Sequence, residues 1–316
     1  MRVLIIGGTG SLGSELSKHY YKAGHEITVL SRDPHKQLLL QPHVPDANFI
    51  LADVCDYSSV LFACQDQDIV IHAAALKHVS VGEKHVQEFV RVNITGTSVV
   101  AAACRAANIK IALFISSDKA VEPVNLYGKT KATGEDIFIA NSYSVLRYGN
   151  VVNSRGSFIY VWRELVRAGK PVELRTPEPT RFYMTISDAI GLIDSAISNY
   201  DGGKVFIPSS LPAFSIWDFA KAFEISEVIK TPLLPGEKQH EVLVSKAEWY
   251  ENYTPKLSIV HKGYDVSHET YSSDNIEPMS IPEIQSAMGT FYYLSILEEV
   301  IKPNVTPRLL EPTPSI

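Results

Sequence analysis

Asp118, Lys119, Tyr127 and Lys131 lie in one short stretch, SSDKAVEPVNLYGKTK (116–131), and have side chains suited to acid–base chemistry. The stretch follows the apolar run IALFI, so Asp118 and Lys119 are expected where a buried strand emerges into a cleft. Tyr127 and Lys131 are four residues apart and would share one face of a helix. A nearby ammonium group favours phenolate and would lower the pKa of a tyrosine from about 10. Such a pair can remove a hydroxyl proton while hydride leaves the same carbon.

Two neighbouring residues extend this candidate site. Ser117 could hydrogen-bond the reacting hydroxyl, and Asn93 could support the proton path. Two structural alternatives stay open. Tyr127 could merely cap a helix, and the adjacent charges of Asp118 and Lys119 could form a plain ion pair.

The elements that must position these residues follow the pattern of βα units on a parallel sheet, because short apolar runs alternate with longer helix-like segments. Amphipathic helices are expected over 14–24 and 93–108. The predicted strands are 3–6, 26–30, 48–52, 68–74, 110–116, 143–148 and 204–208. We therefore expect an α/β fold with a Rossmann-type doubly wound parallel sheet, which places ligands at the carboxyl ends of its strands.

A glycine-rich turn, GGTGSLG (7–13), lies between the first predicted strand and a helix. Gly8, Gly10 and Gly13 satisfy G-x-G-x-x-G, and Gly7 extends the motif to a wider spacing. Glycine lets the backbone turn tightly and approach a pyrophosphate, which then meets the N-terminus of the helix. The placement of the motif after a strand predicts a dinucleotide site.

The end of the second strand favours NADP over NAD. An NAD site normally has an acidic residue there for the ribose 2′-hydroxyl, whereas Ser31 and Arg32 suit a 2′-phosphate. NAD stays the less favoured alternative because Asp33 follows closely, and Arg32 could also be only a solvated surface charge. Asp53, after the third strand, is a candidate partner for the adenine amine. The expected cofactor-binding residues are Gly7, Thr9, Gly10, Ser11, Leu12, Gly13, Ser31, Arg32, Lys36, Asp53, Val54, Ala73, Ala74, Ala75, Lys77, Asn93, Tyr127 and Lys131.

The βα rhythm fades after about residue 150. Residues 1–150 and about 182–207 are expected to form the NADP-binding domain, and about 151–181 and 208–300 a smaller C-terminal substrate-binding lobe. Four prolines in the last 15 residues favour an extended tail over about 301–316.

Composition and charge argue against several function classes. The formal net charge of −6, without a basic block, argues against affinity for nucleic acid or an anionic membrane surface. The start MRVLIIGG already predicts a strand and turn, so no signal peptide is expected, and no apolar run reaches the roughly 18 residues needed to span a bilayer. Cys55, Cys64 and Cys104 lack metal-type spacing and are expected to be reduced thiols in a cytoplasmic protein without a metal site.

Several motifs together resemble the extended short-chain dehydrogenases/reductases, and most closely the soluble, C5-inverting UDP-N-acetylglucosamine 4,6-dehydratases. The membrane-anchored relatives resemble the chain too, but usually have methionine where Tyr127 stands. The motifs are SRDPHKQ (31–37), HAAALKHV (72–79), NITGT (93–97), SSDKAVEPVNLYGKTK, RYGNVVNSRGS (147–157), TRFYMT (180–185) and LPGEKQHE (234–241).

The resemblance implies a role for each residue of the candidate site. Tyr127, supported by Lys131 and Ser117, is the expected base at the 4-hydroxyl, Lys119 acts at C5, and Asp118 protonates the departing C6 oxygen. A neutral lysine and a protonated aspartate are unusual at neutral pH, so burial is expected to shift both pKa values. The expected substrate-binding residues are Lys77, Ser117, Asn150, Arg155, Arg181 and Glu237.

One departure concerns the nucleotide-binding loop, where relatives typically read R-P-G-E-K-x-H-E. Leu234 stands at the position of the arginine, so the identity of the nucleotide sugar is less certain than the catalytic steps. His72, His78, His85 and His240 are interpreted as structural or solvated.

The expected function is NADP-dependent dehydration of UDP-N-acetylglucosamine by a homo-oligomer, for surface-glycan or protein-glycosylation sugar synthesis. The alternatives are an epimerase or reductase of the same fold, a dehydratase for another nucleotide sugar, and a non-catalytic NADP-binding regulator.

Overall fold

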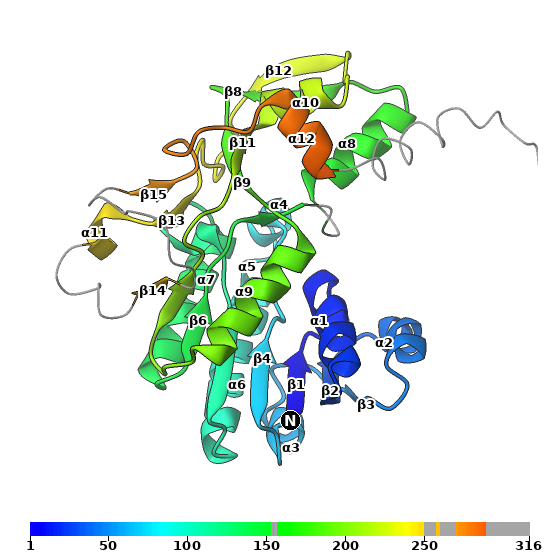
Figure 1. Cartoon of the computed structure of the whole chain (residues 1–316), viewed down its shortest axis with the longest axis vertical. Coiled ribbons are helices and arrows are strands. Elements are labelled where there is room, and N and C mark those ends of the chain that lie inside the picture. The colour runs from blue at the N-terminus through cyan, green and yellow to red at the C-terminus, as the bar shows by residue number, and fades with distance from the viewer. Residues whose placement is uncertain (153, 155–156, 250–256, 260–269, 289–316) are drawn as a thin grey trace, which may run out of the picture.

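A computed structural model of the chain describes residues 1–152, 154, 157–249, 257–259 and 270–288. Within these residues, eight parallel strands form the central sheet in the order β14-β10-β6-β5-β4-β1-β2-β3 (Figure 1). The strands are β1 (Arg2–Ile6), β2 (Glu26–Ser31), β3 (Asn48–Leu51), β4 (Ile69–His72), β5 (Ile111–Ile115), β6 (Ser144–Leu146), β10 (Val205–Ile207) and β14 (Leu257–Ile259).

The central strands are continuous apolar runs because helices cover both faces of the sheet. Almost every residue of β1, β4 and β5 is buried. Ile6 of β1 pairs with Leu30 on one side and with His72 on the other, so the ends of three strands meet at one edge. The predicted doubly wound α/β fold is confirmed.

The central sheet has eight strands among the described residues, one more than the seven that we predicted for it. The additional strand, β14, is three residues long, pairs with β10 at the edge of the sheet, and lies in a segment that we assigned to the smaller lobe. A strand this short has too few residues to show periodicity, so its place is decided by the neighbouring strand.

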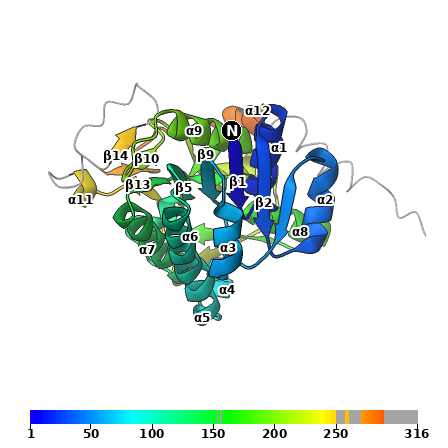
Figure 2. The same ribbon diagram turned by 90° about the horizontal axis from the view of Figure 1, so that it is seen from below.

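Helices lie on both faces of the sheet (Figure 2). α1 (Ser11–Lys22) packs beside α9 (Ile186–Ser198) on one face, and α3 (Tyr57–Cys64), α6 (Gly96–Ala106) and α7 (Leu126–Ala140) form the layer on the other. α2 (Pro34–Leu40) follows β2, while α4 (Val79–Gly82), α5 (Val86–Phe89) and the π-helical turn η2 (Val90–Thr95) precede α6. No described helix has the length and apolar character of a membrane span.

Smaller sheets and helices lie beyond the carboxyl ends of the central strands, in the upper part of Figure 1. They have a core of their own, in which Phe158, Trp162, Phe214, Phe219 and Phe223 pack edge-to-face or tilted. In these sheets β9 (Thr180–Met184) lies between β7 (Asn150–Val151) and β11 (Ala213–Ser215), β8 (Val172–Thr176) pairs with β12 (Val228–Pro232), and β13 (Val242–Val244) pairs with β15 (Tyr271–Ser272). The helices are α8 (Phe158–Arg167), α10 (Ile216–Ala222), α11 (Lys246–Trp249) and α12 (Ile281–Met288).

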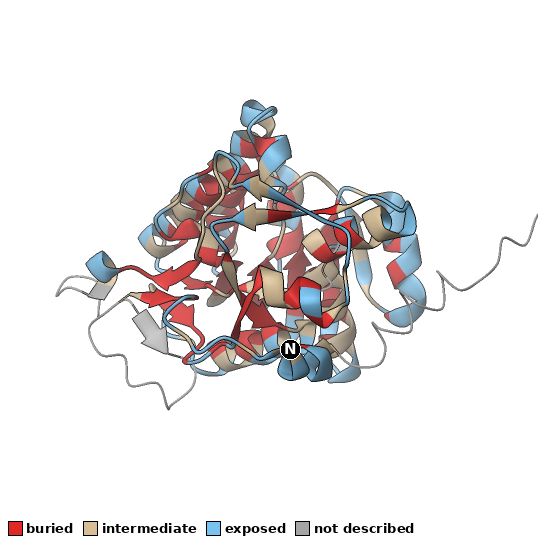
Figure 3. Ribbon diagram, turned by 90° about the horizontal axis from the view of Figure 1, so that it is seen from above, coloured by how far each residue is buried: buried red, intermediate tan, exposed pale blue. Residues whose placement is uncertain are grey.

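The buried residues lie mainly on the strands, and the outer faces of the helices are exposed (Figure 3). The exact domain boundaries stay a prediction, and the expected tail, 301–316, lies outside the described residues.

Candidate active site

A cavity of about 330 Å³ opens at the carboxyl ends of β1, β2 and β4, where a doubly wound sheet binds its ligand. Most of the expected cofactor-binding residues line it. They are Gly7, Thr9, Gly10, Ser31, Arg32, Lys36, Asp53, Val54, Ala73, Ala74 and Ala75. The lining also contains Leu30, Asp33, Ala52, Leu76 and Val92, which the sequence motifs did not single out as binding residues.

The glycine turn brings backbone into contact with backbone at the base of this cavity. Gly7 has a φ of +84°, and a Cβ atom there would lie 2.6 Å from the backbone nitrogen of Ala74. A Cβ atom at Gly13 would lie 2.3 Å from the carbonyl oxygen of Gly7. α1 begins after Gly10 without a side-chain cap, and the positive end of its dipole, which favours an anionic ligand, lies at the glycine turn. The residues present therefore fit a dinucleotide.

The charged residues at the rim form ion pairs with one another. Lys36 Nζ lies 2.8 Å from Asp33 Oδ2, so the acidic residue that favours NAD is already neutralised by a lysine. Arg32 Nη1 lies 3.5 Å from Glu88 Oε1 of α5, and Asp53 Oδ2 is 3.0 Å from a second arginine, Arg91. These contacts hold Arg32 beside the cavity in a half-exposed position, from which its guanidinium can reach a phosphate.

Several expected cofactor residues do not line this cavity. Ser11 lines a neighbouring cavity between α1 and α2. The side-chain amide of Asn93 accepts a hydrogen bond from Leu76 N and donates hydrogen bonds to the Leu76 carbonyl oxygen and to Thr130 Oγ1, so it holds these segments together. The residues outside the cavity lining are Ser11, Leu12, Gly13, Lys77, Asn93, Tyr127 and Lys131.

The candidate acid–base residues lie directly after β5, in the short helix η3 (Asp118–Ala120). Ser117 Oγ donates a hydrogen bond of 2.6 Å to Asp118 Oδ1, and Lys119 Nζ lies 3.1 Å from the same oxygen. Asp118 Oδ2 is buried and has no hydrogen-bond partner among the described residues. The ion pair that we considered as an alternative is therefore present, but within a buried cluster rather than at the surface.

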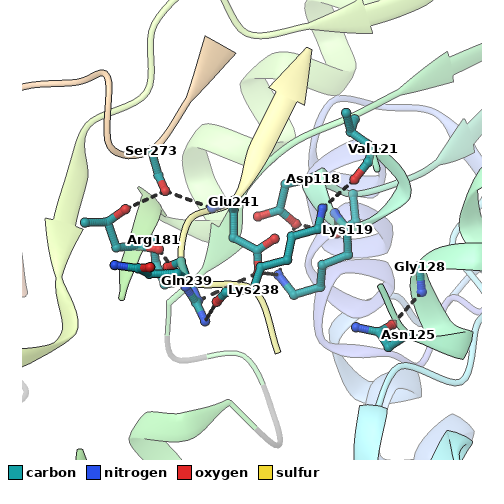
Figure 4. A network of polar contacts seen from close by, with 12 residues as sticks. Asp118, Lys119, Val121, Asn125, Gly128, Arg181, Lys238, Gln239, Glu241 and Ser273 are labelled. Atoms are coloured by element: carbon teal, nitrogen blue, oxygen red, sulfur yellow. Dashed lines mark hydrogen bonds and ion pairs between the residues drawn. The ribbon is translucent and has the colours of Figure 1, made fainter. Parts of the chain in front are cut away.

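A second carboxylate, that of Glu241, completes this cluster from the smaller lobe (Figure 4). Its Oε1 atom lies 3.1 Å from Lys119 Nζ and 3.7 Å from Arg181 Nε. Glu241 ends the motif LPGEKQHE, but the sequence indicates no role for it, because nothing in its spacing from Lys119 indicates contact. The histidine before it and its own acidic side chain were the only available signals.

The shifts in pKa within this cluster agree only in part with the expectation. Burial raises the pKa of the Asp118 carboxyl, although the Lys119 charge opposes this, and the direction of this shift is the one expected for a group that must donate a proton. Burial also disfavours the Lys119 ammonium, but the carboxylates of Asp118 and Glu241 outweigh it and hold the pKa of Lys119 well above its usual value. The expectation that burial makes Lys119 neutral is wrong for this arrangement, because that inference did not include Glu241.

Tyr127 and Lys131 lie on α7 as predicted, but they differ from the expected pair in their electrostatics. Burial raises the pKa of the Tyr127 phenol to about 12, although Lys119 opposes this. Lys131 Nζ donates a 2.6 Å hydrogen bond to the Ile115 carbonyl oxygen and lies 4.3 Å from the centre of the Phe114 ring, and burial lowers its pKa to about 7. The lysine therefore faces β5, and the expected depression of the tyrosine pKa is not present.

Comparison with known proteins gives the family. Residues 3–262 match the family described as "Polysaccharide biosynthesis protein". The chain is 34% identical over 311 residues to UDP-N-acetylglucosamine 4,6-dehydratase (inverting) from Campylobacter jejuni, with 86% of this chain and 92% of that protein covered. This chain belongs to the polysaccharide biosynthesis family. The resemblance inferred from the sequence motifs is confirmed.

The chain is also similar to a protein named for a different activity and to a solved structure. UDP-glucose 4-epimerase from Rickettsia rickettsii is 30% identical over 329 residues, which cover 92% of this chain and 96% of the epimerase. The solved structure of Pen from Bacillus thuringiensis superposes with a TM-score of 0.82 at 30% identity and covers 91% of this chain and 96% of that chain. Family membership alone therefore leaves both dehydratase and epimerase chemistry open.

The structure places the expected substrate-binding residues in different surroundings. Asn150 lies on β7, and its Oδ1 atom is buried without a hydrogen-bond partner among the described residues. Lys77 Nζ lies 3.4 Å from Ser154 Oγ, whereas Arg155 lies outside the described residues. Glu237 pairs with Arg175 at 3.0 Å, in the turn where exposed Leu234 stands.

Arg181 has a position that the sequence did not predict. Its Nη1 atom donates to the carbonyl oxygens of Thr180 and Gln239, and its Nη2 atom donates to that of Lys238, at 2.7 to 3.0 Å. These bonds occupy much of the guanidinium fork that we expected to bind the substrate. In this arrangement Arg181 orders the 234–241 loop and contacts Glu241.

Proposed function

We propose that the protein is an NADP-dependent 4,6-dehydratase that acts on UDP-N-acetylglucosamine with inversion at C5. The observation that carries this proposal is the buried Asp118–Lys119 pair, 3.1 Å apart at the carboxyl end of β5, on the strand next to β4 and its dinucleotide cavity. An epimerase needs only removal and return of hydride at C4, whereas loss of water needs an additional acid and base.

The dinucleotide would be held by the glycine turn and by Ser31, Arg32 and Lys36, whose charges and hydroxyl favour a 2′-phosphate. When bound, it supplies a hydride acceptor at C4 and a hydride donor at C6. Tyr127 removes the proton of the 4-hydroxyl, and the resulting ketone acidifies the hydrogen at C5. Burial raises the pKa of the Tyr127 phenol to about 12, so removal of the 4-hydroxyl proton requires added positive charge near this ring.

Asp118 and Lys119 then share the elimination. A proton moves from Lys119 Nζ to Asp118 Oδ1, across the observed 3.1 Å contact, and produces a neutral amine and a carboxylic acid. The amine takes the C5 proton while the acid protonates the C6 oxygen, which leaves as water. Both residues return to the observed ion pair, so their charges balance over the step.

The test is incubation with UDP-N-acetylglucosamine in D₂O, followed by proton NMR. A C6 methyl signal with deuterium at C5 is expected, and the ring couplings give the C5 configuration. Asp118→Asn and Lys119→Met are expected to reduce methyl formation by at least about a hundredfold. Lys129→Met, which alters an exposed lysine of α7, is the matched control and should leave it unchanged.

The second candidate is an epimerase, which the 30% identity to UDP-glucose 4-epimerase favours. A product inverted at C4 that keeps its C6 hydroxyl would establish it and contradict dehydration. Binding of NADP without turnover of any UDP-sugar would instead indicate a regulator. A dehydratase for another nucleotide sugar is tested with Leu234→Arg, which restores the loop arginine of the relatives and should lower the KM for UDP-N-acetylglucosamine. The homo-oligomer and the cytoplasmic location stay predictions.

A further inference from the structure

Glu241 has the geometry of a residue that acts on the proposed base. Its side chain is 3% exposed, and Oε1 lies 3.1 Å from Lys119 Nζ. The second oxygen, Oε2, is buried without a hydrogen-bond partner among the described residues. Burying a carboxylate in this way costs free energy unless a charge compensates it, and Lys119 and Arg181 are the cations in contact with it.

The backbone holds this carboxylate in place from both parts of the protein. Glu241 N donates to Ser273 Oγ at 3.0 Å, and Ser273 N donates to the Glu241 carbonyl oxygen at 2.8 Å. Two contacts join the loop before Glu241 to the residues that follow β5. Lys238 Nζ donates to the Val121 carbonyl oxygen (Figure 4). Asn125 Nδ2 donates to the Gly236 carbonyl oxygen. The backbone that carries Glu241 is therefore fixed relative to the residues after β5, and its carboxylate contacts Lys119 from that position.

We propose that Glu241 is a positioning residue that orients Lys119 for proton removal at C5. It accepts a hydrogen bond from the Lys119 amine, which directs the nitrogen lone pair toward the sugar. It then stabilises the ammonium group that forms when Lys119 takes the C5 proton. The aspartate of a serine-protease triad acts on its histidine in the same way. This role rests on the proposed dehydratase function.

The charges that face Lys119 determine how this role depends on pH. Two carboxylates, Asp118 and Glu241, favour its ammonium form, while the cation of Arg181 disfavours it. Lys238 and the Tyr127 phenol also interact with Lys119. In the proposed step Lys119 becomes neutral by giving its proton to the ionised Asp118 carboxylate, so turnover is expected to rise with pH as Asp118 ionises. The charge of Glu241 raises the pKa values of both Asp118 and Lys119. Removing that charge therefore moves the acid limb to lower pH and makes Lys119 a weaker base.

The experiment measures turnover and C5 deuterium incorporation against pH for the full chain. Glu241→Gln has the same shape without the charge, and we expect its acid limb to move down by about one pH unit or more and its plateau to fall by about ten- to a hundredfold. Glu241→Asp keeps the charge and should keep the acid limb near that of the wild type at a reduced rate. Glu173→Gln removes an exposed carboxylate of the same lobe and is the matched control.

A lower plateau with an unmoved acid limb in Glu241→Gln would overturn the proposal, because a purely structural role predicts that result. A second readout needs no turnover. The Lys119 pKa is measured by NMR titration of ¹³C-labelled lysine, assigned with Lys119→Met, in the wild type and in both Glu241 variants. If Glu241→Gln does not fold, the test depends on Glu241→Asp, which must lower turnover without moving the acid limb of the pH profile. A wild-type rate in Glu241→Asp would contradict the proposed positioning role.

The two readouts also separate this inference from the proposed function. A wild-type protein that forms no dehydrated product overturns the function, and the positioning role in C5 chemistry with it. The titration then still decides the contact itself: a lower Lys119 pKa in Glu241→Gln supports the electrostatic coupling, and an unchanged value refutes it.

Discussion

The side-chain amide of Asn125 joins the start of α7 to the 234–241 loop. Its Oδ1 atom accepts a hydrogen bond of 2.8 Å from Gly128 N and caps the helix that carries Tyr127. Its Nδ2 atom donates a bond of 2.8 Å to the Gly236 carbonyl oxygen, in the loop that carries Glu241. One residue thus positions the candidate base at C4 relative to the loop of the smaller lobe.

Asn125→Ser should separate these two roles, because serine caps a helix but is too short to reach the loop. Loss of the loop bond, at about 1 kcal/mol, is expected to raise the KM for the nucleotide sugar by about fivefold, as measured by steady-state kinetics. The melting temperature should stay near that of the wild type. Asn125→Ala loses the cap too and should melt at a lower temperature. An unchanged KM in both variants would show that the loop closes without Asn125.

Arg32 is predicted to determine the choice between the two dinucleotides. Arg32→Ala removes a charge-assisted hydrogen bond to the 2′-phosphate and should weaken NADP binding by about ten- to a hundredfold, with little change for NAD. Titration calorimetry with each nucleotide measures this. Arg105→Ala, which removes an exposed arginine of α6, is the control. An equal loss of affinity for both nucleotides would contradict the assignment.

Arg147 is predicted to be essential for stability. It follows β6, and its Nη2 atom lies 2.6 Å from Glu135 Oε2 of α7 and 2.7 Å from Glu248 Oε1 of α11. Arg147→Met leaves both carboxylates without their cation in a mostly buried place, and the free energy of unfolding should fall by about 3–5 kcal/mol. Urea denaturation measures the change. Lys221→Met breaks an exposed pair with Asp218, and no measurable change is expected from it. A small effect in Arg147→Met would mean that water reaches the two glutamates.

His72 is predicted to make the protein sensitive to acid. Its ring is stacked on Phe138 and fully buried, and burial, assisted by the Lys131 charge, lowers its pKa to about 3 from 6.5. Between these values the unfolded chain binds a proton that the folded chain does not. The free energy of unfolding therefore rises with pH in this window, by up to about 1.4 kcal/mol per pH unit.

His72→Phe should flatten this dependence, as measured by urea denaturation at several pH values between about 4 and 6.5. His35→Gln removes an exposed histidine and should keep the wild-type slope. An equal slope in the wild type and His72→Phe would attribute the acid sensitivity to other groups.

The sequence by itself determined the fold class and most of the cofactor cavity. Strands buried on both faces are continuous apolar runs, and a glycine turn between a strand and a helix has a strong local signature, so both are properties of adjacent residues. The same holds for Tyr127 and Lys131, whose shared helical face follows from their spacing. The edge strand β14 was missed because its three residues depend on β10 for their conformation.

Only the tertiary structure decided the electrostatics of the candidate active site. Glu241 is more than a hundred residues from Lys119 in the chain, and their contact exists because the 234–241 loop folds back onto the residues after β5. That contact reversed the expected shift of the Lys119 pKa. Likewise, the tertiary structure decides that Lys131 donates a hydrogen bond to a carbonyl oxygen of β5 and that Arg181 donates one to a carbonyl oxygen of the 234–241 loop. The pKa of a buried group depends on every charge within a few ångströms, and sequence spacing does not report which distant charges those are.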